Sequence, residues 1–77
     1  EFKVELYPNP VKDILKIKLP NASNGNIVFY NVLGENVLSG DLSSRTMQID
    51  LSGLKSGVYL VRIQTENQST IKKIVKL

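Results

Sequence analysis

The sequence predicts an all-β fold, a seven-stranded antiparallel immunoglobulin-like β-sandwich. Apolar and polar residues alternate with a period of two in short runs along the whole chain. Turn-forming residues separate these runs at roughly the 8–12-residue spacing that sandwiches and barrels show. With 77 residues, the chain has room for one small hydrophobic core, so residues 1–77 are expected to form a single domain.

The first predicted strand ends at a pair of prolines. Phe2, Val4 and Leu6 alternate with charged residues, and Pro8 and Pro10 follow directly. Proline has no backbone N–H to donate to a sheet and is confined to edge strands or bends. This run is therefore expected to end in an exposed bend.

The second run, residues 15–19, has the clearest alternation, and residues 20–25 end it as a loop. A third strand is predicted over 27–32. Residues 33–36 then form a hairpin turn in which Gly34 takes a left-handed conformation, because glycine adopts positive φ at little cost. The return strand begins directly after this turn.

The middle of the chain is predicted to contain a strand between two loops. Ser39-Gly40-Asp41 and Ser43-Ser44 are predicted to interrupt the strands, and alternation resumes over 47–51. Serine–glycine pairs bracket Leu54 in the loop 51–57, so Leu54 is expected to fold back onto the core.

The last two runs form a predicted hairpin. In residues 58–65, the face formed by Tyr59, Val61 and Ile63 is expected to be buried. A polar turn leads to residues 70–77, whose apolar positions also fit one face of a helix. Eight residues make a poor isolated helix, so a strand paired with 58–65 is favoured. A five-stranded oligonucleotide-binding barrel is the alternative fold.

The composition argues against intrinsic catalysis. The chain contains neither Cys nor His. Thiolate or imidazole nucleophile pairs and the usual zinc or copper ligand sets therefore cannot be built. The aspartates are scattered without the spacing of a carboxylate pair, so no catalytic residue, metal or cofactor is expected.

The longest apolar runs are four residues, and no membrane-spanning segment or signal peptide is predicted; any leader would lie outside these residues.

The positive charge is concentrated near the end of the chain. Residues 1–51 carry five basic and six acidic side chains, whereas residues 52–77 carry five basic and one acidic. Lys72, Lys73 and Lys76 resemble a weak phosphate-binding patch, but lysine is also common on edge strands, where it prevents sheet-to-sheet addition. Nucleic-acid binding is not expected, because no aromatic platform accompanies the charge.

A sugar-binding site would require exposed aromatic side chains. Phe29 and Tyr59 are predicted to point inward, so Tyr7 and Tyr30 remain as candidates. An adhesive or carbohydrate-binding module is therefore one alternative function, and a passive spacer is another.

An ordered set of short motifs goes further than composition. It comprises Tyr7-Pro8-Asn9-Pro10-Val11; Leu15, Ile17 and Leu19; Ile27, Phe29, Tyr30, Asn31 and Gly34; Ile49, Asp50, Leu51, Leu54, Gly57, Val58 and Tyr59; and Lys73, Val75 and Lys76. In this order the chain resembles the C-terminal sorting domain of proteins exported by the bacterial type IX secretion system. Each motif also has a structural explanation: Pro8, Asn9 and Pro10 shape a bend, Gly34 permits a turn, and Leu54 fills the core.

The resemblance implies a non-catalytic address label at the end of a larger cargo protein. In the family, cargo enters the periplasm of a Gram-negative bacterium, is recognised there by an outer-membrane translocon with its shuttle proteins, and is exported to the cell surface or medium. A cysteine-protease sortase commonly removes the domain by a cut upstream of the sandwich, and can attach the cargo to lipopolysaccharide. The domain itself is expected to be monomeric.

Recognition is expected to depend on the last two strands and the turn before them. Their net positive charge and terminal position motivate this hypothesis, and strand addition with lysines orienting the partner is the expected mode. The residues concerned are Gly57, Val58, Tyr59, Lys72, Lys73, Val75 and Lys76.

Overall fold

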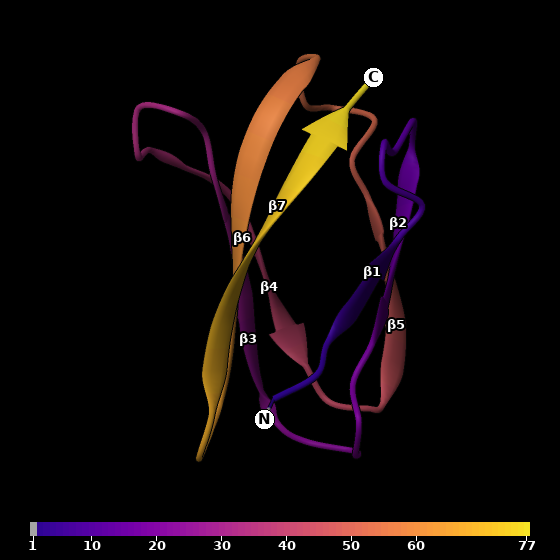
Figure 1. Ribbon diagram of the computed structural model, residues 1–77, viewed down its shortest axis with the longest axis vertical. Coiled ribbons are helices and arrows are strands. Elements are labelled where there is room, and N and C mark those ends of the chain that lie inside the picture. The colour runs from indigo at the N-terminus through magenta and orange to yellow at the C-terminus, as the bar shows by residue number, and fades with distance from the viewer. Residues whose placement is uncertain (1) are drawn as a thin grey trace.

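A computed structural model describes residues 2–77 as two stacked sheets of β-strands (Figure 1). The seven strands within these residues are β1 (Glu5–Tyr7), β2 (Ile14–Lys18), β3 (Gly25–Tyr30), β4 (Asn36–Leu42), β5 (Thr46–Asp50), β6 (Gly57–Thr65) and β7 (Ser69–Lys76). The structure confirms the predicted all-β fold and strand number. The first strand begins later than its alternation predicts, although Val4 before it is buried.

One sheet has the order β1-β2-β5 and the other β4-β3-β6-β7, and all neighbouring strands are antiparallel. The hairpins β1–β2, β3–β4 and β6–β7 each stay within one sheet, while the other connections cross between sheets (Figure 1). This two-layer arrangement is a sandwich and not the alternative barrel. The C-terminal run is a strand paired with β6, which confirms the favoured prediction over a helix.

The core lies between the two sheets and contains side chains from both. Alternate residues of β2, β3 and β6 point inward, as the period of two predicts. Phe29 is the largest fully buried side chain, and the prediction that Phe29 and Tyr59 point inward is confirmed. The buried apolar residues are Val4, Val11, Leu15, Ile17, Leu19, Ile27, Val28, Phe29, Leu42, Leu51, Tyr59, Val61, Ile63 and Ile74.

The β3–β4 hairpin turns earlier than the sequence predicts. β3 ends at Tyr30 because the Asn31 side chain organises the turn: its Oδ1 accepts hydrogen bonds from the backbone N–H groups of Leu33 (2.9 Å) and Glu35 (3.0 Å). Gly34 has φ +85°, as predicted. Val32 is consequently an exposed turn residue, and its prediction as part of a strand is wrong.

β4 continues through the polar segment that was expected to interrupt it. Residues 39–41 pair with β3, and Gly40 lies opposite Ile27. Ser39 and Asp41 are exposed on the solvent side of the strand, so their polarity is compatible with strand pairing. The expected break at these residues is therefore wrong.

The loop between β5 and β6 is closed by local contacts. The Leu54 N–H donates to the Leu51 carbonyl at 2.9 Å, and the half-buried Leu54 side chain packs against the core, as expected. The Ser52 N–H donates to Asp50 Oδ1 at 2.9 Å, and this hydrogen bond lowers the pKa of the Asp50 carboxyl. These contacts hold the segment that leads into β6.

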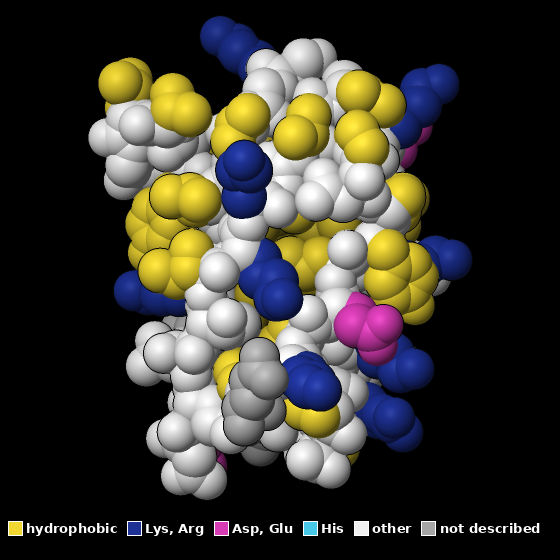
Figure 2. Space-filling view, in the orientation of Figure 1, with side chains coloured by type: hydrophobic (Ala, Val, Ile, Leu, Met, Phe, Trp, Pro, Cys, Tyr) yellow, Lys and Arg dark blue, Asp and Glu magenta, His cyan; other side chains and the backbone are white. Residues whose placement is uncertain are grey.

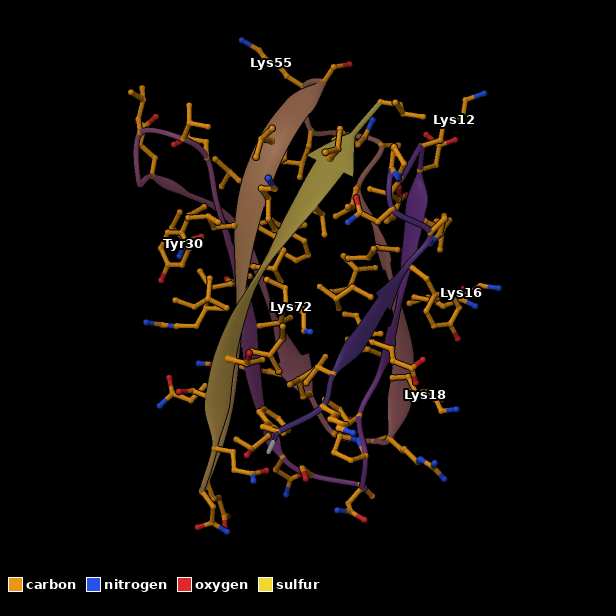
Figure 3. All side chains as sticks on the ribbon, in the orientation of Figure 1. Lys12, Lys16, Lys18, Tyr30, Lys55 and Lys72 are labelled. Carbon is orange, nitrogen blue, oxygen red and sulfur yellow. The ribbon has the colours of Figure 1, made fainter. Side chains whose placement is uncertain are left out.

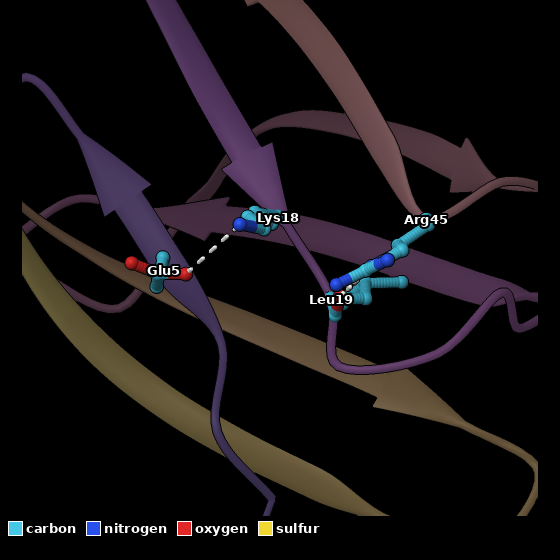
Figure 4. A network of polar contacts seen from close by, with 4 residues as sticks. All are labelled: Glu5, Lys18, Leu19 and Arg45. Carbon is cyan, nitrogen blue, oxygen red and sulfur yellow. Dashed lines mark hydrogen bonds and ion pairs between the residues drawn. The ribbon is translucent and has the colours of Figure 1, made fainter.

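Polar contacts also join the strands of the smaller sheet at one end (Figure 4). Lys18 Nζ lies 4.0 Å from Glu5 Oε2 across β1 and β2. Arg45 and Leu19 are joined twice, by the Leu19 N–H to the Arg45 carbonyl (2.7 Å) and by Arg45 Nε to the Leu19 carbonyl (3.3 Å). An exposed ion pair contributes little, so the backbone pairing at Leu19 is the stronger tie.

We predict that Phe29→Ala destabilises the fold by about 3–5 kcal/mol, because it leaves a cavity in the centre of the core. A domain of this size has about 4–12 kcal/mol of stability, so much of the total would be lost. Urea titration monitored by circular dichroism measures the change. The control Val32→Ala, at an exposed turn residue, is expected to stay within about 0.5 kcal/mol of the unmodified chain; equal effects of the two variants would contradict this assignment of the core.

Candidate recognition surface

Two motifs from opposite ends of the sequence meet beside β7. The Asn9 side chain donates from Nδ2 to the Lys73 carbonyl (3.2 Å) and accepts at Oδ1 from the Val75 N–H (3.0 Å). The Val11 N–H donates to the Val75 carbonyl, and the Leu77 N–H donates to the Val11 carbonyl, both at 2.8 Å. We refer to the contacts of Asn9 and Val11 with residues 73–77 as the terminal clamp.

The prolines on either side of Asn9 keep this segment outside the regular sheet. Pro8 and Pro10 are exposed, and the Tyr7–Pro8 and Asn9–Pro10 peptide bonds are cis. Val11 forms one parallel bridge with Lys76 and is fully buried. The expected exposed bend is confirmed. The Asn9 side chain forms hydrogen bonds with β7 that a neighbouring strand would otherwise form.

The clamp covers only the second half of the outer edge of β7. Hydrogen-bonding direction alternates along a strand, so Ser69 and Ile71 direct their backbone groups to the same side as Val75. Within residues 2–77, no backbone hydrogen bond reaches Ser69 or Ile71 from that side. The first half of β7 therefore remains an open sheet edge.

Strand alternation divides the three C-terminal lysines between two faces. Lys72 and Lys76 lie on the same side of β7 as the core residue Ile74, whereas Lys73 lies on the outer face. Lys76 is only 7% exposed, and its Nζ donates to the Leu77 carbonyl at 2.7 Å. The lysines therefore do not form one patch.

Lys72 lies at the open side of the sandwich, between β7 and β1 (Figure 3). A groove of about 380 Å³ runs along this side and is lined by Val4, Glu5, Leu6, Tyr7, Asn9, Lys72 and Lys73. In the space-filling view, basic side chains follow this side of the molecule, with apolar side chains around them (Figure 2). The groove is open and shallow, and it borders the free edge of β7.

The turn into β6 is fixed by a glycine and a tyrosine. Gly57 has φ +152°, a conformation that other residues rarely adopt. The Tyr59 hydroxyl donates to the Lys55 carbonyl at 2.6 Å while its ring lies in the core. Immunoglobulin-like domains use a similar tyrosine corner to fix the approach to the equivalent strand. Val58, between them, points to the outer face.

The two aromatic candidates for sugar binding lie on different sheets. Tyr7 is exposed on β1, whereas Tyr30 is half-buried on β3 with the Arg62 guanidinium carbon 5.8 Å from its ring centroid. They do not form a shared platform.

Other kinds of site lack support in the part of the chain that the structure describes. Residues 2–77 bring together no group of three or more acidic, histidine or cysteine side chains suited to a metal ion. The described residues also contain no helix long and apolar enough to cross a membrane.

Comparison with known proteins identifies the family. A sequence model described as the secretion system C-terminal sorting domain matches residues 5–77. The chain belongs to this family. The domain is therefore a non-catalytic sorting signal of secreted type IX cargo, and the family assignment made from its motifs is confirmed. As such a signal, it is recognised by secretion machinery and directs secretion across the outer membrane.

Two curated relatives are β-agarases of Zobellia galactanivorans. Beta-agarase A is 31% identical over 67 residues, which cover 86% of this sorting domain and 12% of the agarase. Beta-agarase D is 31% identical over 71 residues, which cover 92% of the domain and 14% of the agarase. The domain thus spans about one eighth of these relatives.

A solved structure supports the fold. PorZ, a surface component of the type-IX secretion system of Porphyromonas gingivalis, superposes with a TM-score of 0.70 at 20% identity. The match covers 96% of this sorting domain and 11% of the PorZ chain. It shows that the two share the sandwich architecture.

We predict that Asn9→Ala loosens the second half of β7, because it removes two hydrogen bonds of the terminal clamp. The loss is expected to be about 1–2 kcal/mol, and amide hydrogen exchange is expected to accelerate most at Val75. The control Asn24→Ala changes an exposed loop asparagine whose side chain forms no hydrogen bond with another of residues 2–77, and it should leave that amide unchanged. Equal protection of Val75 in both variants would show that the clamp does not hold the strand.

Proposed function

We propose that the type IX machinery recognises this domain in its folded form through the last two strands. The match of the family model across residues 5–77 is the main support, because it includes both strands in full. The proposed recognition residues are Gly57, Val58, Tyr59, Lys72, Lys73, Val75 and Lys76.

The geometry divides these residues by role. Val58, Lys73 and Val75 lie on the outer face and are proposed to contact the receptor, while Lys72 faces the groove beside the open edge. The remaining residues hold that surface in place: Gly57 and Tyr59 set the turn, and Lys76 is buried under the end of the strand.

The open half of β7 suits recognition by strand addition. A strand from the receptor can pair with the free backbone groups of Ser69 and Ile71, as exposed sheet edges commonly permit. The terminal clamp limits such pairing to the first half of the strand. The edge therefore offers a short docking site with a defined end.

We further infer that the domain is carried by a longer cargo protein, which reaches the cell surface or medium through the periplasm. The two β-agarases, in which the matching segment is a small part of the chain, support this arrangement. The proposed partners are the outer-membrane translocon, its shuttle and a sortase that cuts upstream of the sandwich. The alternative of a sugar-binding module is not favoured, since Tyr7 and Tyr30 lie on different sheets.

A reporter fusion tests the function. Residues 1–77 fused to the C-terminus of a periplasmic reporter are expected to direct it to the cell surface or medium of a host with type IX secretion. The same segment placed inside the reporter should leave it in the periplasm, because a sorting label is expected to act only at the C-terminus. A passive spacer would instead tolerate either position. Retention of the C-terminal fusion in the periplasm would contradict the proposal.

A second experiment tests the charge. Replacing Lys72, Lys73 and Lys76 together by Gln is expected to lower export at least tenfold if charge orients the partner. The matched control changes Lys12, in the segment between β1 and β2, and Lys16 and Lys18, in β2, to Gln (Figure 3). Thermal unfolding of both variants separates recognition from folding. Normal export of the first variant, with an unchanged melting temperature, would exclude a role for charge.

A further inference from the structure

The outer face of β6 and β7 carries apolar side chains in water. Ile71 is 64% exposed, Leu60 45% and Val58 39%, and Val75 is half-buried beside them. In Figure 2, apolar side chains gather on the left, the side to which the labelled Tyr30 points in Figure 3. Contiguous exposed apolar residues on a small protein commonly mark an interaction surface.

Two cations lie among these apolar residues in a regular pattern. The register pairs Val58 with Val75, Leu60 with Lys73 and Arg62 with Ile71. Directly opposed side chains on one face of a sheet are neighbours at about 5 Å. Each cation therefore has an apolar residue across from it. We call these six residues the outer patch.

Neither cation has an acidic partner in the described part of the domain. The ion pair found within residues 2–77 joins Lys18 to Glu5, on the other sheet. Arg62 lies over the Tyr30 ring, and its Nε is buried without a hydrogen-bond acceptor. The buried Nε is out of reach of a docking partner, but the terminal guanidinium nitrogens of Arg62 are not among the buried unpaired atoms, and a carboxylate is their preferred partner.

We propose that the outer patch docks against a protein of the secretion machinery whose contact surface is apolar and carries carboxylates opposite Lys73 and Arg62. This inference rests on the proposed function and adds the chemistry of the receptor. The apolar residues supply the buried area, and the two cations set orientation and specificity.

The charge pattern favours a protein receptor over a second copy of the domain and over an anionic lipid surface. A symmetric dimer through the outer patch would bring cations from both copies into one apolar interface, and none of the six residues is acidic. A surface that binds anionic lipid has cations around a protruding apolar group that enters the membrane. Here the arrangement is the reverse, because Lys73 lies between the apolar residues Ile71 and Val75 on its own strand. A cation surrounded by apolar residues instead fits a carboxylate in a protein surface.

The test uses the reporter fusion with single substitutions. Lys73→Glu and Leu60→Ser are each expected to reduce export at least tenfold, as for residues near the centre of an interface. Lys73→Gln is expected to reduce export less than Lys73→Glu, because it removes the attraction without adding repulsion. Unfolding of each 77-residue chain is measured in parallel.

Matched controls lie on the other sheet. Ile14→Ser changes an apolar strand residue that is 41% exposed, close to the value for Leu60, and Lys16→Glu reverses an exposed strand lysine. Both are expected to export normally. If the unmodified fusion is not exported, the proposed function fails. If it is exported and the outer-patch variants are exported equally well, the outer patch is rejected together with the receptor contacts proposed for Val58, Lys73 and Val75, while the sorting function stands.

Two binding measurements distinguish a protein receptor from a second copy of the domain and from a lipid surface. Sedimentation of the 77-residue chain is expected to show a monomer, and the chain is expected not to co-sediment with phosphatidylglycerol vesicles. A dimer that Leu60→Ser dissociates, or vesicle binding that Lys73→Glu abolishes, would overturn the assignment to a protein receptor.

Discussion

The strands of this small domain bury one face and leave most of the other in water, with Val28 on the outer face of β3 as a buried exception, and the rest of the structure depends on this division. The inward residues of two short sheets supply most of the core, with Phe29 as its largest fully buried side chain, and the flanking residues Val4, Val11, Leu19 and Leu51 complete it. A chain of 77 residues has little stability to spare. The inner faces are therefore committed to packing, and function is left to the outer faces, the edges and the turns.

That division also explains how far the sequence could be interpreted. The period of two correctly predicts seven strands and the inward direction of Tyr59, Val61 and Ile63. It does not predict the continuation of β4 through Ser39 and Asp41, since polar residues on the solvent side of a strand resemble those of a loop. The early turn at Asn31 was missed for a different reason: its side-chain hydrogen bonds leave no periodic signal.

The candidate site was predictable in part. The motifs correctly place the sorting domain in its family, but they do not reveal that Asn9 contacts Lys73 and Val75, because more than sixty residues separate these positions. The three C-terminal lysines do not form one group, and the sequence itself indicates this. Alternation along β7 places Lys73 opposite to Lys72 and Lys76, and the structure has this arrangement.

The terminal clamp makes the shape of the last strand conditional on the beginning of the domain. β6 holds residues 73–76 on one edge, and Asn9 and Val11 hold residues 73–77 on the other. Without the contacts of Asn9 and Val11, the whole outer edge of β7 would be open, and its second half would lose one of its two neighbours. If the receptor binds the ordered last strand, as proposed, its full binding energy is available only from the finished fold, and unfolded cargo would bind more weakly without a separate inspection step.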